Sequence, residues 1–192
     1  MQLSENYHKG KTFENLSETG GQITGSTFER CTFLRCNLQQ TLFDECTFNN
    51  CLFESCDLSL IKFKTTTVNQ VMISNSKAIG ISWRECSNPV NVHFKSSQIS
   101  YSSFYGKKLR KMQVINCVAI EADFTTCDMQ HASFEGTDLS GARFSDTDLT
   151  QANFSGARNY QINPGINRIK GAKFSLPDAL SLLNYLDIQI VD

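Results

Sequence analysis

Residues 122–156 read ADFTT-CDMQH-ASFEG-TDLSG-ARFSD-TDLTQ-ANFSG, and this stretch decides the fold. Each group of five has a small residue first and a large apolar residue third, while the other positions are mostly polar. A period of five matches neither the 3.6 residues of an α-helix turn nor the two of a long strand. The pattern therefore predicts a chain that turns a corner after each short straight segment.

The same pattern extends upstream in two runs that differ by one residue in frame. The frame shifts between Cys86 and Val92, around Ser87–Asn91, where Pro89 indicates a bulged corner or a tolerated insertion. The large apolar positions are Phe28, Phe33, Leu38, Phe43, Phe48, Phe53, Leu58, Phe63, Val68 and Ile73, then Phe94, Ile99, Phe104, Leu109, Val114, Ala119, Phe124, Met129, Phe134, Leu139, Phe144, Leu149 and Phe154.

Four straight segments close a square coil of twenty residues, and successive coils stack through parallel backbone hydrogen bonds. Residues 20 apart should then lie on each other, as Phe28 on Phe48, Phe33 on Phe53, Phe124 on Phe144 and Phe134 on Phe154. The predicted fold class is an all-β solenoid, a right-handed quadrilateral parallel β-helix with a short C-terminal α-helix.

The chain divides into a lead-in at 1–20, the repeat at 21–158 and a capping and dimerisation segment at 159–192. In the last segment, FSLPDALSLLNYLDIQIVD (174–192), Ser175 and Asp178 resemble a helix capping box, and a strand-like stretch follows at 188–191. Its apolar stripe either caps the solenoid or forms a two-fold interface, and we favour the interface. The expected interface residues are Leu176, Leu180, Leu183, Leu186, Ile188 and Ile190.

All eight cysteines occupy the small position of their group, so we expect buried free thiols. No C-x₂-C spacing predicts a metal site or a disulfide framework, and no cofactor is expected. The histidines His8, His93 and His131 are scattered without nucleophile or carboxylate partners. The chain is therefore not expected to be an enzyme.

Charge is uneven along the chain although the total is −1 and the pI is about 6.3. Residues 1–60 carry −4, residues 61–120 carry +8, residues 121–157 carry −6 and the remainder carries +1. The balance does not indicate direct nucleic-acid binding. The N-terminal residues lack the apolar stretch of a signal peptide, and no run could span a membrane, so we expect a cytoplasmic protein.

Two features of the charged residues are candidate contact sites. Lys107 falls in an inward small position, where an unpaired lysine is too costly. The coil is therefore expected to open around 105–108, unless the lysine extends outward between corners. The resulting partner-contact candidates are Tyr105, Lys107, Lys108, Arg110 and Lys111.

The second candidate is acidic. Asp123 should pair with Arg143 and Asp138 with Arg158 on the next coil, whereas Asp128 beneath Asp148 forms a like-charge pair. Together with Glu121, these acids suggest a rod that presents carboxylates as duplex DNA presents phosphates. The candidate acidic face is Asp123, Asp128, Glu135, Asp138, Asp146 and Asp148.

The repeat, the ending GAKFSLPDALSLLNYLDIQI (171–190), CDLSLIKF (56–63) and SSFYG (102–106) resemble the Qnr/MfpA class of pentapeptide-repeat proteins, and most of all its albicidin-resistance branch. The resemblance implies a homodimer joined at the C-terminal ends. It also implies a DNA-like rod that binds DNA gyrase, and sometimes topoisomerase IV, and protects it from quinolones or albicidin-type toxins. Well-known members carry projecting loops, whereas this chain has only the break at 87–91 and the basic stretch at 107–111. The alternative is a scaffold repeat protein with another partner.

Overall fold

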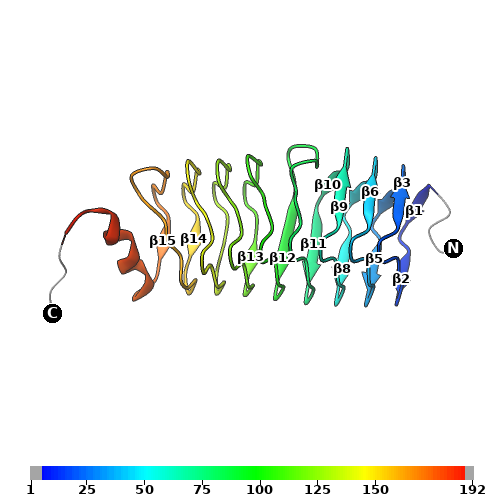
Figure 1. The fold of residues 1–192 in the computed structure, drawn as a ribbon, viewed down its shortest axis with the longest axis horizontal. Coiled ribbons are helices and arrows are strands. Elements are labelled where there is room, and N and C mark those ends of the chain that lie inside the picture. The colour runs from blue at the N-terminus through cyan, green and yellow to red at the C-terminus, as the bar shows by residue number, and fades with distance from the viewer. Residues whose placement is uncertain (1–5, 189–192) are drawn as a thin grey trace.

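The computed structural model describes residues 6–188. Their coils lie side by side in a rod, with the helix at the C-terminal end (Figure 1). The rod is an all-β parallel solenoid of about eight turns, which confirms the predicted fold class.

The strands are short and pair only in parallel, and they define the sides of the coil. We call side A the sheet β1-β4-β7-β10, side B the sheet β2-β5-β8-β11-β12-β13 with β14-β15, and side D the sheet β3-β6-β9; side C is joined by isolated bridges through Asn37, Asp57 and Lys77. The strands are β1 (Tyr7–Lys9), β2 (Thr12–Glu14), β3 (Gln22–Thr24), β4 (Thr27–Glu29), β5 (Thr32–Leu34), β6 (Leu42–Asp44), β7 (Thr47–Asn49), β8 (Leu52–Glu54), β9 (Lys62–Lys64), β10 (Thr67–Asn69), β11 (Val71–Ser74), β12 (Val92–Lys95), β13 (Val114–Ile115), β14 (Asn153–Phe154) and β15 (Lys173–Phe174).

Residues 20 apart stack as the repeat predicts. The rings of Phe28 and Phe48 lie 5.0 Å apart at 9°, and those of Phe134 and Phe154 lie 5.0 Å apart at 13°. The other two predicted pairs also stack, at 4.5 Å on side B and 5.2 Å on side D. Paired strands extend on both sides of 21–158, since β1 pairs with β4 and β14 with β15.

The frame shift is an extra residue in one coil. Ile73 of β11 pairs with Phe94 of β12, a spacing of 21 rather than 20. After this point the spacing returns to 20 residues, because Phe94 pairs with Val114 of β13. One inserted residue in the corner at 86–91 is therefore absorbed locally.

The inward small position is a hydrogen-bond donor as well as a space-filling residue. Thr66 Oγ1 donates to the Phe43 carbonyl at 2.9 Å, and Cys36 Sγ donates to the Phe13 carbonyl at 3.3 Å. Each donor reaches a carbonyl 23 residues earlier, so threonine, serine and cysteine are interchangeable here. All eight cysteines are buried and free, as predicted. Burial raises the pKa of the Cys127 thiol to about 12.

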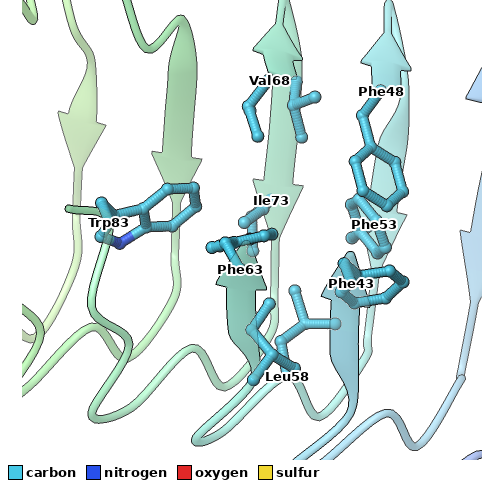
Figure 2. A pocket seen from close by; sticks show the side chains of 10 residues that line it. Phe43, Phe48, Phe53, Leu58, Phe63, Val68, Ile73 and Trp83 are labelled. Carbon is cyan, nitrogen blue, oxygen red and sulfur yellow. The ribbon is translucent and has the colours of Figure 1, made fainter. Parts of the chain in front are cut away.

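A packing gap lies in the core where the phenylalanine stacks give way to smaller residues. On sides A and B the residues following Phe48 and Phe53 are Val68 and Ile73. Beside them, near Phe63, the interior leaves an apolar void of ≈ 20 Å³ (Figure 2). The side chains that line such a void lose dispersion contacts on that side.

Replacing Val68 with isoleucine should therefore stabilise the protein. Burying one added methylene in the void should raise the free energy of unfolding by about 0.8 kcal/mol. Thermal unfolding followed by circular dichroism measures the change. The same substitution at Val114, which is fully buried away from the void, should give no gain because it overpacks the core. A gain at Val114 but none at Val68 would contradict the assignment of the gap.

The C-terminal helix η1 (Asp178–Tyr185) has 3₁₀ geometry, and Leu182 packs against the core. The predicted capping box is wrong. Ser175 Oγ and Asp178 Oδ1 instead accept the backbone N–H groups of Gly156 and Asn159, at 3.2 and 3.0 Å. These side chains join the helix to the last regular coil rather than capping the helix itself.

The helix and the residues on either side of it leave much of the apolar stripe exposed. Leu176, Leu180, Leu186 and Ile188 are 77%, 46%, 54% and 55% exposed, and Leu183 is half-buried. Ile190 and most of the predicted strand at 188–191 lie outside the described residues. Within 6–188, no helix has the length and apolar character that crossing a bilayer requires.

Candidate partner-binding surface

The structure brings together only three of the six candidate acidic residues. Asp128 and Asp148 lie in successive coils on side A, and Asp146 lies at the adjoining corner. The other three are distributed around the rod, with Asp123 on side D, Glu135 on side B and Asp138 on side C. The predicted acidic surface is therefore not one face.

Side A also carries the predicted basic cluster. Isolated bridges connect Lys108 to Asp128, Asp128 to Asp148 and Asp148 to Arg168 in successive coils. The two candidate sites are thus neighbours on one side of the rod. We call side-A surface the residues Lys108, Arg110, Lys111, Asp128, Asp146, Asp148, Arg168 and Lys170. Tyr105 is separate from it, on side D, where its ring lies 5.5 Å from the Arg84 guanidinium carbon.

Arginines from neighbouring coils flank the like-charge pair. Arg110 Nε donates to Asp128 Oδ2 at 2.6 Å, and Arg168 Nη1 lies 3.7 Å from Asp148 Oδ2. Gln130 Nε2 also donates to Asp148 Oδ2, at 3.0 Å. The column therefore runs basic, acidic, acidic, basic, and the expected repulsion is relieved by both ends.

The aspartates at this repeat position also hold the corners. Asp148 Oδ1 accepts the Thr150 backbone N–H at 3.0 Å. Asn153 occupies the same position of its group and accepts the Ser155 N–H at 3.1 Å. Asparagine can therefore replace aspartate here without losing the turn.

The pKa values of these carboxyl groups follow from the same contacts. Burial by itself would raise the pKa of Asp148, but the hydrogen bonds from Thr150 and Gln130 and the charge of Arg168 outweigh it and lower the pKa. Hydrogen bonds from Asn159 and Ser140 lower the pKa of Asp138. Both groups are therefore held in the charged form.

One predicted ion pair forms and the other does not. Arg143 Nη2 lies 3.2 Å from Asp123 Oδ2. Asp138 and Arg158 are bridged through the backbone, but their charged groups do not come within ion-pair distance, and Asp138 instead accepts from Asn159 Nδ2 at 3.0 Å. The shorter asparagine is better placed to reach this carboxylate.

Two acids, Glu135 and Asp146, are exposed and form no ion pair with any described residue. Their closest side-chain contacts are weak hydrogen bonds of 3.5 Å from Asn153 and 3.4 Å from Ser145. A basic partner on side A would meet the Asp146 carboxylate without displacing an arginine. The exposure of the two acids distinguishes them from Asp123, Asp128 and Asp148, which form ion pairs. The 20-residue stacking of the sequence could not predict this difference.

Two shallow grooves adjoin on side A. One, of ≈ 450 Å³, lies among Arg110, Asp128, Asp146 and Asp148, with Ile166 at its rim. The other, of ≈ 660 Å³, is bounded by residues 89–91 of the shifted corner and shares Arg110 and Asp128. Neither resembles a metal centre, and the described residues hold no cluster of three or more His, Cys, Asp or Glu suited to a metal ion.

The expected opening of the coil at Lys107 is wrong. Lys107 is buried, and its Nζ donates to the carbonyls of Arg84 and Cys86 at 2.7 Å each. The coil stays closed because these carbonyls solvate the ammonium group in place of water. The acceptors come from the shifted corner one coil earlier, which five-residue spacing could not reveal.

Known protein families and solved structures share this repeating geometry. A family model described as a pentapeptide repeat region matches residues 26–104, and a model of eight pentapeptide repeats matches residues 116–158. No curated protein matches the chain. A trypsin-treated form of QnrB1, a plasmid-mediated fluoroquinolone resistance protein, is 21% identical over 96% of this chain and 97% of its own, with a TM-score of 0.59.

Two further solved structures share the fold. Full-length QnrB1 is 22% identical over 92% of this chain and 100% of its own, with a TM-score of 0.52. HetL, involved in heterocyst differentiation regulation in the cyanobacterium Nostoc sp. strain PCC 7120, is 13% identical over 89% of this chain and 88% of its own, with a TM-score of 0.55. The two family models together cover more than half of the residues, and the stacked five-residue coils are what they describe. The chain belongs to the pentapeptide-repeat family.

Proposed function

We propose that this chain is a non-enzymatic binding protein that contacts DNA gyrase through Asp128, Asp146 and Asp148 of the side-A surface and protects it from gyrase poisons. The observation that carries the proposal is the column of charged side chains on a rigid rod, with Asp128, Asp146 and Asp148 gathered on one side. Carboxylates at coil spacing suit the lysines and arginines with which such an enzyme holds DNA phosphates.

The fold shared with QnrB1, a fluoroquinolone resistance protein, and the resemblance to the Qnr/MfpA class support the same partner. Topoisomerase IV is the related second target. Within that class the albicidin-resistance branch is the one we favour, so both a quinolone and an albicidin-type toxin belong in the test. A homodimer joined through the exposed leucines of the C-terminal segment completes the proposal.

The test is a gyrase supercoiling assay with a poison, titrated with the purified protein. Asp128→Asn, Asp146→Asn and Asp148→Asn together remove three charges from side A, and the new amide oxygens at 128 and 148 can still accept the corner N–H groups, as Asn153 does. We expect this variant to need about tenfold more protein for the same protection, because two arginines lose their carboxylates and repel a basic partner. Protection by the wild type should weaken as salt rises.

A matched control removes three charges from the other sides through Asp123→Asn, Glu135→Gln and Asp138→Asn. This variant should protect gyrase as the wild type does, and both variants should keep the wild-type melting temperature within about 3 °C. Equal losses in the two variants would mean that total charge matters and side A does not. Full protection by the side-A variant would exclude these aspartates as the contact.

A scaffold role with an acidic partner is the second candidate. Lys108 and Lys111 are exposed and form no ion pair with the described residues, within a stretch, 61–120, of charge +8. The HetL likeness shows that this fold also occurs in a protein of a different description. Lys108→Glu with Lys111→Glu should leave gyrase protection intact if the acids carry it, and should abolish partner capture if this alternative is right.

A further inference from the structure

The shifted corner lacks backbone hydrogen bonds that regular coils have. In a regular coil, a backbone N–H donates to the carbonyl 21 residues earlier, as Thr67 donates to Cys46 at 2.9 Å. Across the insertion the spacing becomes 22, as Gln98 donates to Ser76 at 2.9 Å. The N–H of residue 108 should therefore donate to the carbonyl of residue 86.

That hydrogen bond is replaced by two others. The Lys108 N–H donates to Asn88 Oδ1 at 3.3 Å, so no backbone donor reaches the Cys86 carbonyl. The Lys107 Nζ occupies this place, at 2.7 Å from the Cys86 carbonyl and 2.7 Å from that of Arg84. A buried carbonyl without a donor is costly, so the ammonium group has a specific role in the corner.

A hydroxyl side chain, which fills the inward position elsewhere in this column, does not fit this role. Two coils later on side A, Thr147 donates its hydroxyl hydrogen to the Phe124 carbonyl at 2.7 Å. A hydroxyl has one hydrogen and a short reach, so it cannot serve two carbonyls of a wider corner. An ammonium on a four-carbon stem has three hydrogens, and the buried stem fills the space the insertion leaves.

We propose that the inserted residue and Lys107 form a single structural device, in which the buried ammonium replaces the missing backbone hydrogen bond. It thereby fixes the corner at 86–91 as a rigid wall of the groove beside Lys108 and Arg110. Lys107 is a positioning residue for the side-A surface. A partner then meets a preformed corner and loses little entropy in ordering it.

The first test is a double-mutant cycle on thermal stability. One variant replaces the six residues 86–91 with the five-residue sequence TTVNQ of positions 66–70, which lies on the same side one coil earlier. The other is Lys107→Thr, the residue found at positions 66 and 147 of this column. Each single change should lower the melting temperature by about 5 °C or more.

The combination should restore a regular coil and return the melting temperature to within about 2 °C of the wild type, since each change removes the reason for the other. Additive losses would overturn the proposal, because they would mean that the lysine and the insertion act independently.

The second test locates the effect by hydrogen exchange. Lys107→Met keeps the length of the side chain and removes its donors. The amides of Ser87 and Asn91, which donate to Thr66 and Val68 at 3.0 and 3.1 Å, should exchange at least tenfold faster in this variant. The amides of β4 should not change.

Unchanged exchange at 87 and 91, or an increase that is uniform along the rod, would overturn the positioning role. Neither measurement involves gyrase, so the device stands or fails separately from the proposed function.

Discussion

Replacing Phe124 with alanine is expected to lower the free energy of unfolding by about 3–5 kcal/mol. The ring is fully buried and stacks between Phe104 and Phe144, at 5.2 Å from each. It also meets Phe134 edge-on at 5.3 Å. In a solenoid each coil is held mainly by its two neighbours, so a gap here weakens both interfaces of the coil. Urea unfolding followed by circular dichroism measures the loss.

Phe174→Ala is the matched control for this prediction. Its ring is half-buried and stacks on one side only, on Phe154 at 5.1 Å, because the solenoid ends there. We expect less than half of the loss seen at Phe124, with the same dependence on urea concentration. If the two substitutions cost the same, stacking between coils would not be the main source of stability.

The contrast between these two positions shows what the sequence can predict about the fold. The five-residue period placed Phe124 inside the rod, and its partner Phe144 at a distance of 20 residues, correctly. The period is informative because every coil repeats the same steric problem, so each apolar position is specified many times over. The break at 86–91 was also visible, since one extra residue displaces the frame.

What the sequence could not predict depends on hydrogen bonds between different coils. Lys107 is closed in by carbonyls of a corner 21 and 23 residues earlier, a consequence of the insertion that no local pattern contains. Ser175 and Asp178 have capping-box spacing, yet their oxygens serve the coil below the helix.

The candidate contact surface was predicted only in part for a similar reason. The six acids are close in sequence, but each corner turns the chain to another side, so Asp123 and Asp138 lie on different sides of the rod from Asp128. Stacking by 20 identified the Asp128–Asp148 pair. It did not identify Arg110, which lies 18 residues before Asp128 and reaches its carboxylate from an offset position. Arg168 stacks directly on Asp148, but it lies beyond the predicted repeat at 21–158.

The second large effect concerns the C-terminal leucines. Changing Leu180 and Leu186 together to aspartate should convert the proposed homodimer into a folded monomer. Both side chains are about half exposed, so they can be charged without disturbing the core, whereas Leu183 is half-buried and Leu182 packs on the core. Light scattering at about 10 μM should give twice the 21.6 kDa chain mass for the wild type and 21.6 kDa for the variant. The variant should not dimerise, because burying two charged carboxylates in an apolar interface without a partner of opposite charge is too costly.

A control with the same charge change is available elsewhere on the rod. Leu60 and Tyr101 are 49% and 59% exposed, and changing both to aspartate should leave the dimer intact. If dimerisation supports gyrase protection, the C-terminal variant should also need at least about tenfold more protein in the supercoiling assay, because two linked rods bind with a higher effective concentration than one. A wild type that is already monomeric at 10 μM would leave the exposed leucines as the outer surface of a cap. A monomeric control pair would instead mean that added negative charge, and not the loss of this apolar stripe, separates the chains.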